Sequence, residues 1–163
     1  MLIAIISDIH DNEVNLEKCL AWCCDNKIEK IICCGDITNS ETLEILSNKF
    51  LGEIFLVRGN ADSYNEEEVI KYKNIVYGGE TSVFEIAGFK VGLCHEPFLI
   101  DKILSKNKCN IIFYGHTHKP WIESREDTKI INPGTLGGVF TRATFAIWEP
   151  ETGRIELKLL ENI

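Results

Sequence analysis

The first eleven residues constrain the fold of this chain more than any other stretch. An apolar run from Ile3 to Ile6 is followed by Ser7 and Asp8, and His10 comes two residues later. A continuous apolar run of this length predicts a strand that is buried on both faces of a sheet. In open α/β sheets, ligands bind just beyond the carboxyl ends of such strands. The oxygen and nitrogen ligands of Asp8 and His10 favour a divalent metal there, and a capping aspartate beside a surface histidine is the alternative.

Length and charge limit the classes of protein that need considering. The 163 residues are expected to form a single domain, 1–163, with a sizeable core. The net charge of −8 argues against a broad basic surface, so we expect no large nucleic acid as partner. No apolar run approaches the roughly 20 residues that span a bilayer, and the first run lacks the basic segment of a signal peptide. We therefore expect a cytoplasmic protein with no membrane partner.

Seven cysteines are present, and most lie within apolar segments. Cysteines of this kind are expected to be reduced and buried, which favours a reducing compartment. A zinc or redox role is the alternative for the three that lie close together in the sequence. These are Cys19, Cys23 and Cys24.

The first part of the chain predicts alternating strands and helices, at residues 2–7, 12–26, 30–34, 40–50 and 53–57. This alternation implies parallel pairing with right-handed crossovers. Each strand is followed by polar residues, which parallel pairing would bring to one edge of the sheet.

Local signals support the two predicted helices. Asn12 is expected to cap the first helix, and Asn39 or Ser40 the second. Apolar residues at mixed three- and four-residue spacing are expected to pack the first helix onto the core. They are Val14, Leu16, Cys19, Leu20, Cys23 and Cys24.

The remaining chain predicts a different pattern of pairing. Residues 63–74 are polar and acidic and are expected to form a loop or an irregular helix. From residue 74 onward we expect antiparallel pairing, with Gly-containing turns between strands. The expected strands are 74–77, 81–86, 89–94, 110–114, 121–124, 129–131, 143–148 and 154–160, with a helix at 97–106.

Five strand ends together carry seven side chains that can bind a metal, including every histidine of the protein. These residues are Asp8, His10, Asp36, Asn60, His95, His116 and His118. One zinc ion takes about four ligands, so seven ligands fit two ions that share a bridging carboxylate. Two such ions lie about 3.5–4 Å apart and act together on a phosphate.

The order and spacing of these residues give the chain a family resemblance over nearly its whole length. Asp8-x-His10, Gly35-Asp36, Gly59-Asn60-x-Asp62, His95 and Gly115-His116-Thr117-His118 resemble the signature of the calcineurin-like metallophosphoesterases. Asn132-Pro133-Gly134 and the short length are similar to the small phosphodiesterase branch of bacteria and archaea.

The resemblance implies an α/β fold, a four-layer α-β-β-α sandwich of two mixed sheets packed face to face with flanking helices. It implies that Asp8, His10, Asp36 and His118 bind a first metal, that Asp36 bridges, and that Asn60, His95 and His116 complete a second site. We expect two divalent ions, with Mn²⁺ favoured and nickel, iron or zinc as alternatives, because such ligand sets select weakly among these metals.

The implied activity is that of a hydrolase, a phosphodiesterase in which a hydroxide bridging two metals attacks phosphorus in line. The expected substrate is a small phosphodiester or phosphate ester. The family's usual His is replaced by Ala61, which cannot contact phosphate or assist the leaving group, so diesters or activated esters are favoured. Glu96 replaces the usual Gly, and it either orders water or faces solvent.

Four further residues have competing interpretations. Arg58 and Arg142 either contact the substrate phosphate or form surface salt bridges. Asp11 is expected to be a turn or helix-capping residue, and Asp62 a turn residue that bonds local backbone.

A weak or inactive scaffold of the same fold, acting through protein contacts, is the alternative function. The small retromer subunit of the same branch is such a protein, but here all seven ligand positions hold metal-competent residues. A nuclease is disfavoured by size and charge. A homodimer is favoured over a monomer, and Trp121, Phe140 and Trp148 either form that interface or belong to the core.

Overall fold

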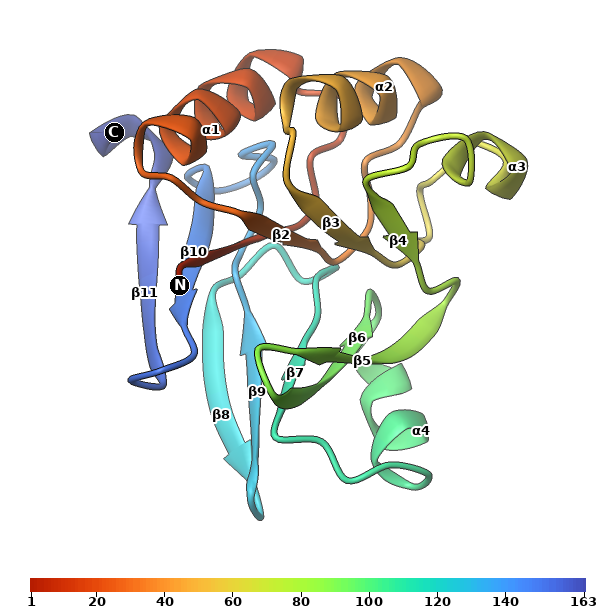
Figure 1. Ribbon diagram of the computed structural model, residues 1–163, viewed down its shortest axis with the longest axis vertical. Helices are drawn as coiled ribbons and strands as arrows, with labels where there is room; N and C mark the ends of the chain where they lie inside the picture. The colour runs from red at the N-terminus through yellow and green to blue at the C-terminus, as the bar shows by residue number, and fades with distance from the viewer.

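The computed structural model describes residues 1–163, whose strands form two sheets packed face to face (Figure 1). The first sheet has the order β11-β10-β1-β2-β3-β4, and the second has the order β5-β6-β7-β9-β8. Strands of the first sheet are β1 (Ile3–Ile6), β2 (Lys30–Cys33), β3 (Glu53–Leu56), β4 (Ile75–Tyr77), β10 (Thr144–Glu149) and β11 (Arg154–Leu159). Strands of the second sheet are β5 (Thr81–Ile86), β6 (Phe89–Cys94), β7 (Ile111–Phe113), β8 (Trp121–Arg125) and β9 (Thr128–Asn132).

Helices flank both sheets, which confirms the expected four-layer α-β-β-α architecture. In Figure 1, α1 and α2 cover the outer face of the first sheet, and α4 lies beside the second sheet on the opposite side of the molecule. The helices are α1 (Glu13–Asp25), α2 (Ser40–Lys49), α3 (Glu66–Val69) and α4 (Ile100–Leu104), with 3₁₀ turns at Pro97–Leu99 and Leu160–Asn162.

Three clusters of buried apolar side chains fill the spaces between these layers. Strand β1 contributes to two of them because successive side chains of a strand point to opposite faces. Ala4 and Ile6 pack toward the helices, whereas Ile3 and Ile5 pack toward the second sheet. Burial on both faces explains why this strand is a continuous apolar run rather than an alternating one.

The two predicted helix caps are confirmed. The Asn12 side chain accepts a hydrogen bond from the backbone N–H of Asn15, and the Asn39 side chain accepts one from Thr42. The predicted apolar stripe of α1 is wrong at its two ends, because Val14 is 78% exposed and Cys24 is also exposed.

The helical period explains which residues of that stripe are buried. Leu16, Cys19, Leu20 and Cys23 have the spacing i, i+3, i+4 and i+7, which places them on one side of α1. All seven cysteines are free thiols, and Cys24 is the exposed one.

The expectation of antiparallel pairing after residue 74 is correct only in part. The hairpins β5–β6, β8–β9 and β10–β11 are antiparallel, but β4 pairs in parallel with β3, and β7 pairs in parallel with both β6 and β9. The segment between β3 and β4 contains α3 and is long enough to cross over the sheet, so the strand returns in the same direction.

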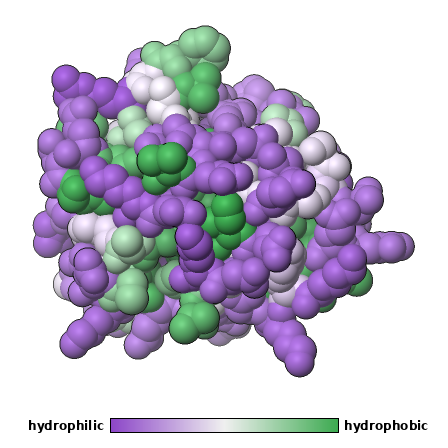
Figure 2. All heavy atoms as spheres, turned by 90° about the horizontal axis from the view of Figure 1, so that it is seen from above, coloured by the Kyte–Doolittle hydropathy of each residue, from purple (hydrophilic) through white to green (hydrophobic).

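The face seen from above in Figure 2 is mostly hydrophilic, and its apolar atoms form separate patches rather than one continuous surface. None of the helices is both long enough and apolar enough to cross a membrane.

Candidate metal centre

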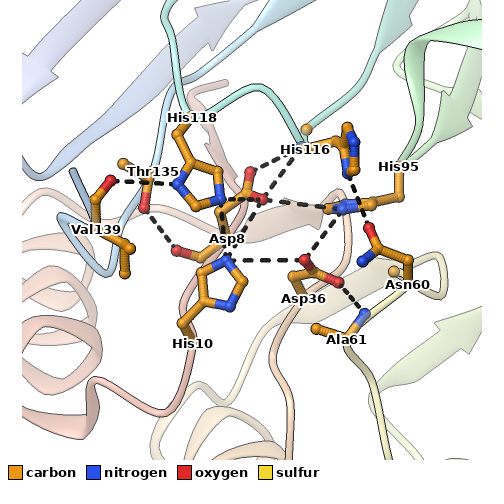
Figure 3. A network of polar contacts seen from close by, with 12 residues as sticks. Asp8, His10, Asp36, Asn60, Ala61, His95, His116, His118, Thr135 and Val139 are labelled. Carbon is orange, nitrogen blue, oxygen red and sulfur yellow. Dashed lines mark hydrogen bonds and ion pairs between the residues drawn. The ribbon is translucent and has the colours of Figure 1, made fainter. Parts of the chain in front are cut away.

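Five strand ends deliver the predicted ligand residues to one place between the sheets (Figure 3). Asp8 and His10 follow β1, Asp36 follows β2, and Asn60 follows β3. His95 follows β6, and His116 and His118 follow β7. The sheet edges therefore assemble a site from residues that lie up to 110 positions apart in the sequence.

Left-handed backbone conformations are concentrated at these strand ends. The φ angle is 55° at Asp8, 48° at His10, 54° at Asp36, 69° at His116 and 57° at His118. Such conformations cost of order 1–3 kcal/mol each for residues other than glycine, and they persist where the surroundings enforce them. The bonds from the Asp8 amide to Gly35 O and from the His10 amide to Asp36 O are among those that hold the strained turns.

The first group of ligand atoms comes from Asp8, His10 and His118. His118 Nε2 lies 3.2 Å from Asp8 Oδ1 and 3.0 Å from His10 Nε2. His118 Nδ1 lies 3.2 Å from the carbonyl oxygen of Val139, which can only accept. The ring proton is therefore on Nδ1, and the lone pair on Nε2 faces the other two ligands.

The second group comes from Asp8, Asp36 and His95. His95 Nε2 lies 3.2 Å from Asp36 Oδ2 and 3.9 Å from Asp8 Oδ1. His95 Nδ1 donates to the carbonyl oxygen of Cys34 at 2.7 Å, which leaves Nε2 as the free ring nitrogen. Asp8 is common to the two groups, and Asp36 Oδ2 also lies 3.7 Å from His10 Nε2.

His116 and Asn60 lie beside the second group and contact each other. His116 Nδ1 is 2.8 Å from Asn60 Oδ1, and the rings of His116 and His95 meet edge to face with centroids 5.3 Å apart. The backbone N–H of His116 donates to both carboxylate oxygens of Asp8 at 3.1 Å. The structure thus brings five of the predicted residues into two groups and leaves this pair at their margin.

The chemistry of these atoms fits divalent cations. His95 Nε2 is buried without a hydrogen-bond partner, although carboxylate oxygens surround it. A ring lone pair that faces a carboxylate is repulsive unless a proton or a cation lies between them. The Nε2 atoms of His10 and His118, which face each other, also need a proton or a cation between them. Carboxylate and imidazole ligands together suit Mn²⁺, Fe²⁺, Ni²⁺ and Zn²⁺.

The ionisation of the two aspartates reflects their surroundings. Burial raises the pKa of the Asp8 carboxyl, and nearby His95 opposes that effect. Burial acts in the same direction on Asp36, but the contacts with His95 and the Ala61 N–H outweigh it and hold the Asp36 pKa below its usual range. Asp36 is therefore the more readily ionised of the two carboxylates.

A family profile described as the calcineurin-like phosphoesterase superfamily domain matches residues 1–153 of this sequence. This chain belongs to that superfamily. A probable metallophosphoesterase of Methanocaldococcus jannaschii is 31% identical over 145 residues, which cover 83% of this chain and 68% of that protein. A phosphodiesterase of the same organism is 27% identical over 152 residues, which cover 86% and 87%.

Solved structures share the fold of this phosphoesterase domain. An archaeal phosphodiesterase matches with a TM-score of 0.87 at 23% identity, over 98% of this chain and 99% of that one. The same fold occurs in Vps29 of Entamoeba histolytica complexed with Zn²⁺, with a TM-score of 0.69 at 21% identity over 97% of both chains. At these identities the likeness establishes the fold alone.

Asp62 has a larger role in the phosphoesterase domain than its sequence position indicates. Its buried carboxylate accepts hydrogen bonds from the amides of Gly59, Asp36 and Thr38, and from the hydroxyl of Tyr64. It therefore ties the turn after β2 to the turn after β3, well beyond the local backbone bonding we expected. The Gly-Asn-x-Asp spacing was the available signal, but spacing alone does not reveal contacts to the β2 turn.

Two further residues, at the end of β9 and just after it, support the site. Thr135 Oγ1 donates to the carbonyl oxygen of Asp8 at 2.8 Å, and the Asn132 side chain donates to that of Gly115 at 2.7 Å. The Asn-Pro-Gly-Thr segment, part of which carries the family resemblance, is the sequence signal for both contacts. Asp11 lies in the turn before α1, and its carboxylate accepts a hydrogen bond from the amide of Asn39, the N-cap residue of α2.

Gly115 is required by close packing against Ser7, Asp8 and His95. A Cβ atom at this position would lie 2.0 Å from Ser7 Oγ, 2.9 Å from Asp8 Oδ2 and 3.0 Å from His95 Nδ1. A side chain here would displace the carboxylate and imidazole from their present places, which explains the glycine before His116.

The two arginines and the two departures from the family pattern occupy distinct places. The Arg58 guanidinium donates to the Asp62 carbonyl oxygen at 3.0 Å, and Arg142 pairs with Glu161 at 3.2 Å on the surface. Ala61 donates its backbone N–H to Asp36 Oδ1 at 2.8 Å. The Glu96 side chain does not cap the turn that follows it.

Proposed function

We propose that this protein is a phosphodiesterase that acts on small phosphodiesters with two divalent ions, and that Mn²⁺ is the preferred metal. The observation that carries the proposal is the sharing of Asp8 between two carboxylate–imidazole groups. Membership of the phosphoesterase superfamily and the 27% identical phosphodiesterase support the same reaction class.

In this proposal each ligand keeps the assignment that the resemblance implied. Asp8, His10, Asp36 and His118 would hold the first ion, and Asn60, His95 and His116 would complete the second site. Asp36 is the proposed bridge, and its low pKa supports that role, although Asp8 also reaches both groups. The carbonyl oxygens of Cys34 and Val139 orient His95 and His118 so that their Nε2 atoms face inward.

When bound, two divalent ions supply hydroxide near neutral pH and stabilise negative charge on the phosphoryl oxygens. The protein's contribution is to fix the ligand side chains in their strained turns. Ala61 offers no side-chain proton, and its backbone N–H is already bonded to Asp36. We therefore propose that diesters and activated esters are hydrolysed in preference to monoesters with poor leaving groups.

The alternative function is a scaffold that works through protein contacts. The shared fold with Vps29 is the observation that favours it, and the zinc complex of that protein means that metal content alone does not separate the alternatives. Catalytic turnover is therefore the deciding measurement.

The test uses protein stripped with a chelator and then supplied with Mn²⁺, and it measures hydrolysis of bis(4-nitrophenyl) phosphate. Activity is expected to depend on added metal, and Asp36→Asn and His116→Ala are each expected to lower it by about 10²-fold or more. Asp127→Asn, which changes an exposed carboxylate between β8 and β9, is the control and should retain wild-type activity. Metal binding without turnover across Mn²⁺, Ni²⁺, Fe²⁺ and Zn²⁺ would instead support the scaffold.

We also propose that the protein is cytoplasmic and forms a homodimer. An apolar hollow lies between the edge strands β8 and β11, and Trp121 and Leu157 in its lining are 49% and 46% exposed. Trp148, by contrast, is part of the core. Sedimentation velocity should give a dimer that Trp121→Ser weakens, and a monomer at all concentrations contradicts this proposal.

A further inference from the structure

Phe140 is an aromatic side chain whose position neither packing nor turn chemistry explains. It is 98% exposed, so its ring gains almost nothing from burial. Its φ angle is 65°, a left-handed conformation that is a genuine outlier for a bulky residue and that glycine would adopt without strain. An outlier of this kind at the margin of a site calls for a functional explanation.

The ring of Phe140 lies against a metal ligand. It stacks on the His118 imidazole with an interplanar angle of 25° and ring centroids 6.2 Å apart. Because almost all of the Phe140 surface is exposed, the ring does not serve to shield His118 from water. Its second face and its edges are open to another planar group.

Hydrogen bonds to the site hold the loop that carries Phe140. The Val139 carbonyl oxygen accepts from His118 Nδ1, and the Gly138 amide donates to Thr135 Oγ1 at 3.2 Å. The Gly137 carbonyl oxygen accepts from the Asn12 side chain at 2.9 Å. These bonds on the preceding residues fix the ring relative to the ligands, so its exposure is not that of a loose loop tip.

The ring also borders a hollow beside the metal centre, with a volume of about 560 Å³. A hollow of this size is within the range that holds small-molecule ligands. Its lining residues are His116, Thr117, His118, Lys119, Phe140 and Thr141. Two of these are proposed metal ligands, so a phosphate at the metal centre would lie next to whatever occupies the hollow.

We propose that Phe140 is a substrate-binding platform on which a planar aromatic group of the phosphoester stacks while the phosphate lies at the metal centre. This inference rests on the proposed phosphodiesterase function and adds the substrate class, namely phosphodiesters that carry a nucleobase or an aryl ring. Stacking on an exposed aromatic side chain recognises any planar ring and needs no pattern of hydrogen-bonding groups.

The test measures binding by calorimetry to the Mn²⁺-loaded protein, using ligand pairs that share a phosphate and differ in the ring. One pair is AMP with ribose 5-phosphate, and the other is phenyl phosphate with methyl phosphate. The ring-bearing member of at least one pair is expected to bind about tenfold more tightly, which corresponds to about 1.4 kcal/mol. A preference confined to AMP identifies nucleoside esters, and one confined to phenyl phosphate identifies aryl esters.

Three variants test whether the Phe140 ring causes the preference for ring-bearing ligands. Phe140→Ala and Phe140→Leu should lose the tenfold preference and leave the affinity for ribose 5-phosphate unchanged, whereas Phe140→Trp should keep the preference. Metal content of each variant is measured alongside, so that loss of the site is recognised separately.

The outcomes separate this inference from the proposed function. Equal affinity of the wild type for both members of both pairs, or an unchanged preference in Phe140→Ala, overturns the stacking platform even when bis(4-nitrophenyl) phosphate is hydrolysed. Absence of turnover in the metal-loaded wild type contradicts the phosphodiesterase function whatever the binding result.

Discussion

The Nε2 atom of His95 lies 3.2 Å from Asp36 Oδ2 in the buried wall of the site, and it has no hydrogen-bond partner. The other ring nitrogen is bonded to a backbone carbonyl oxygen, so the inward nitrogen is the one available to a cation. This contact between the residue after β6 and a residue in the turn after β2 joins the ends of the two sheets through a pair of metal-competent side chains.

Metal binding should therefore stabilise the fold. A ligand that binds only the folded state at a hundred times its Kd contributes about 2.7 kcal/mol. For a chain of this size that corresponds to a rise in Tm of about 5–10 °C, measurable by calorimetry with and without Mn²⁺. Asp36→Asn should lose most of this rise, while the exposed-site control Asp127→Asn should keep it; equal rises in both variants would place the metal elsewhere.

The metal-induced rise in Tm should grow between pH 6 and pH 8. Burial alone would lower the His95 pKa, but Asp36 and Asp8 raise it above the value of 6.5 expected for the unfolded chain. The protonated imidazole thus stabilises the metal-free fold fully below pH 6.5, and that contribution is lost as pH rises through the folded pKa. A metal ion binds only the deprotonated ring. Metal binding therefore contributes more to stability at the pH values where the ring has lost its proton. A rise that is constant or larger at pH 6 would contradict this coupling.

Replacement of Asp62 by alanine should destabilise the protein and loosen the site together. The change leaves the buried amide donors of Gly59 and Asp36 without their acceptor. We expect a loss of about 3 kcal/mol in the free energy of unfolding, measured by urea denaturation, together with weaker Mn²⁺ binding. Asp127→Ala is the matched surface control. A stable variant with unchanged metal affinity would show that the two turns hold without this carboxylate.

Introducing the missing histidine should change the substrate preference. Ala61 is bonded to Asp36 through its backbone, so Ala61→His can keep that bond and add a proton donor. A general acid contributes typically 10²–10⁴-fold, so hydrolysis of 4-nitrophenyl phosphate should rise by about 10²-fold relative to bis(4-nitrophenyl) phosphate. Ala61→Leu adds bulk without a proton donor and should give no such rise. Parallel increases for both substrates would argue against a leaving-group effect.

One thiol should react rapidly in the native protein and seven after denaturation. Cys24 is exposed and the other six are buried, and burial raises the pKa of Cys94 to about 12. A buried thiol with so high a pKa supplies almost no thiolate near pH 8. Titration with an aromatic disulfide reagent, with and without guanidinium, counts both classes. Several rapidly reacting thiols in the native state would contradict this prediction, because the buried cysteines of α1 would then be readily accessible to the reagent.

The sequence by itself determined which residues could form the site and how the chain reaches it. Apolar runs that end in carboxylate or imidazole residues predict buried strands with ligands at their carboxyl ends, because that pattern depends only on neighbours along the chain. The Asn12 and Asn39 caps were predictable for the same reason. The family signature extended this reading to the four-layer sandwich.

Only the tertiary structure decided which strands pair, which turns are in contact and which side chains are buried. The parallel pairing of β4 depends on a crossover, and the bonds of Asp62 to the β2 turn depend on the packing of two turns. The aromatics Trp148 and Phe140 have similar apolar character in the sequence, yet one is in the core and the other is almost fully exposed. Burial depends on contacts between segments that are distant in the sequence, so it cannot be predicted from the neighbouring residues alone.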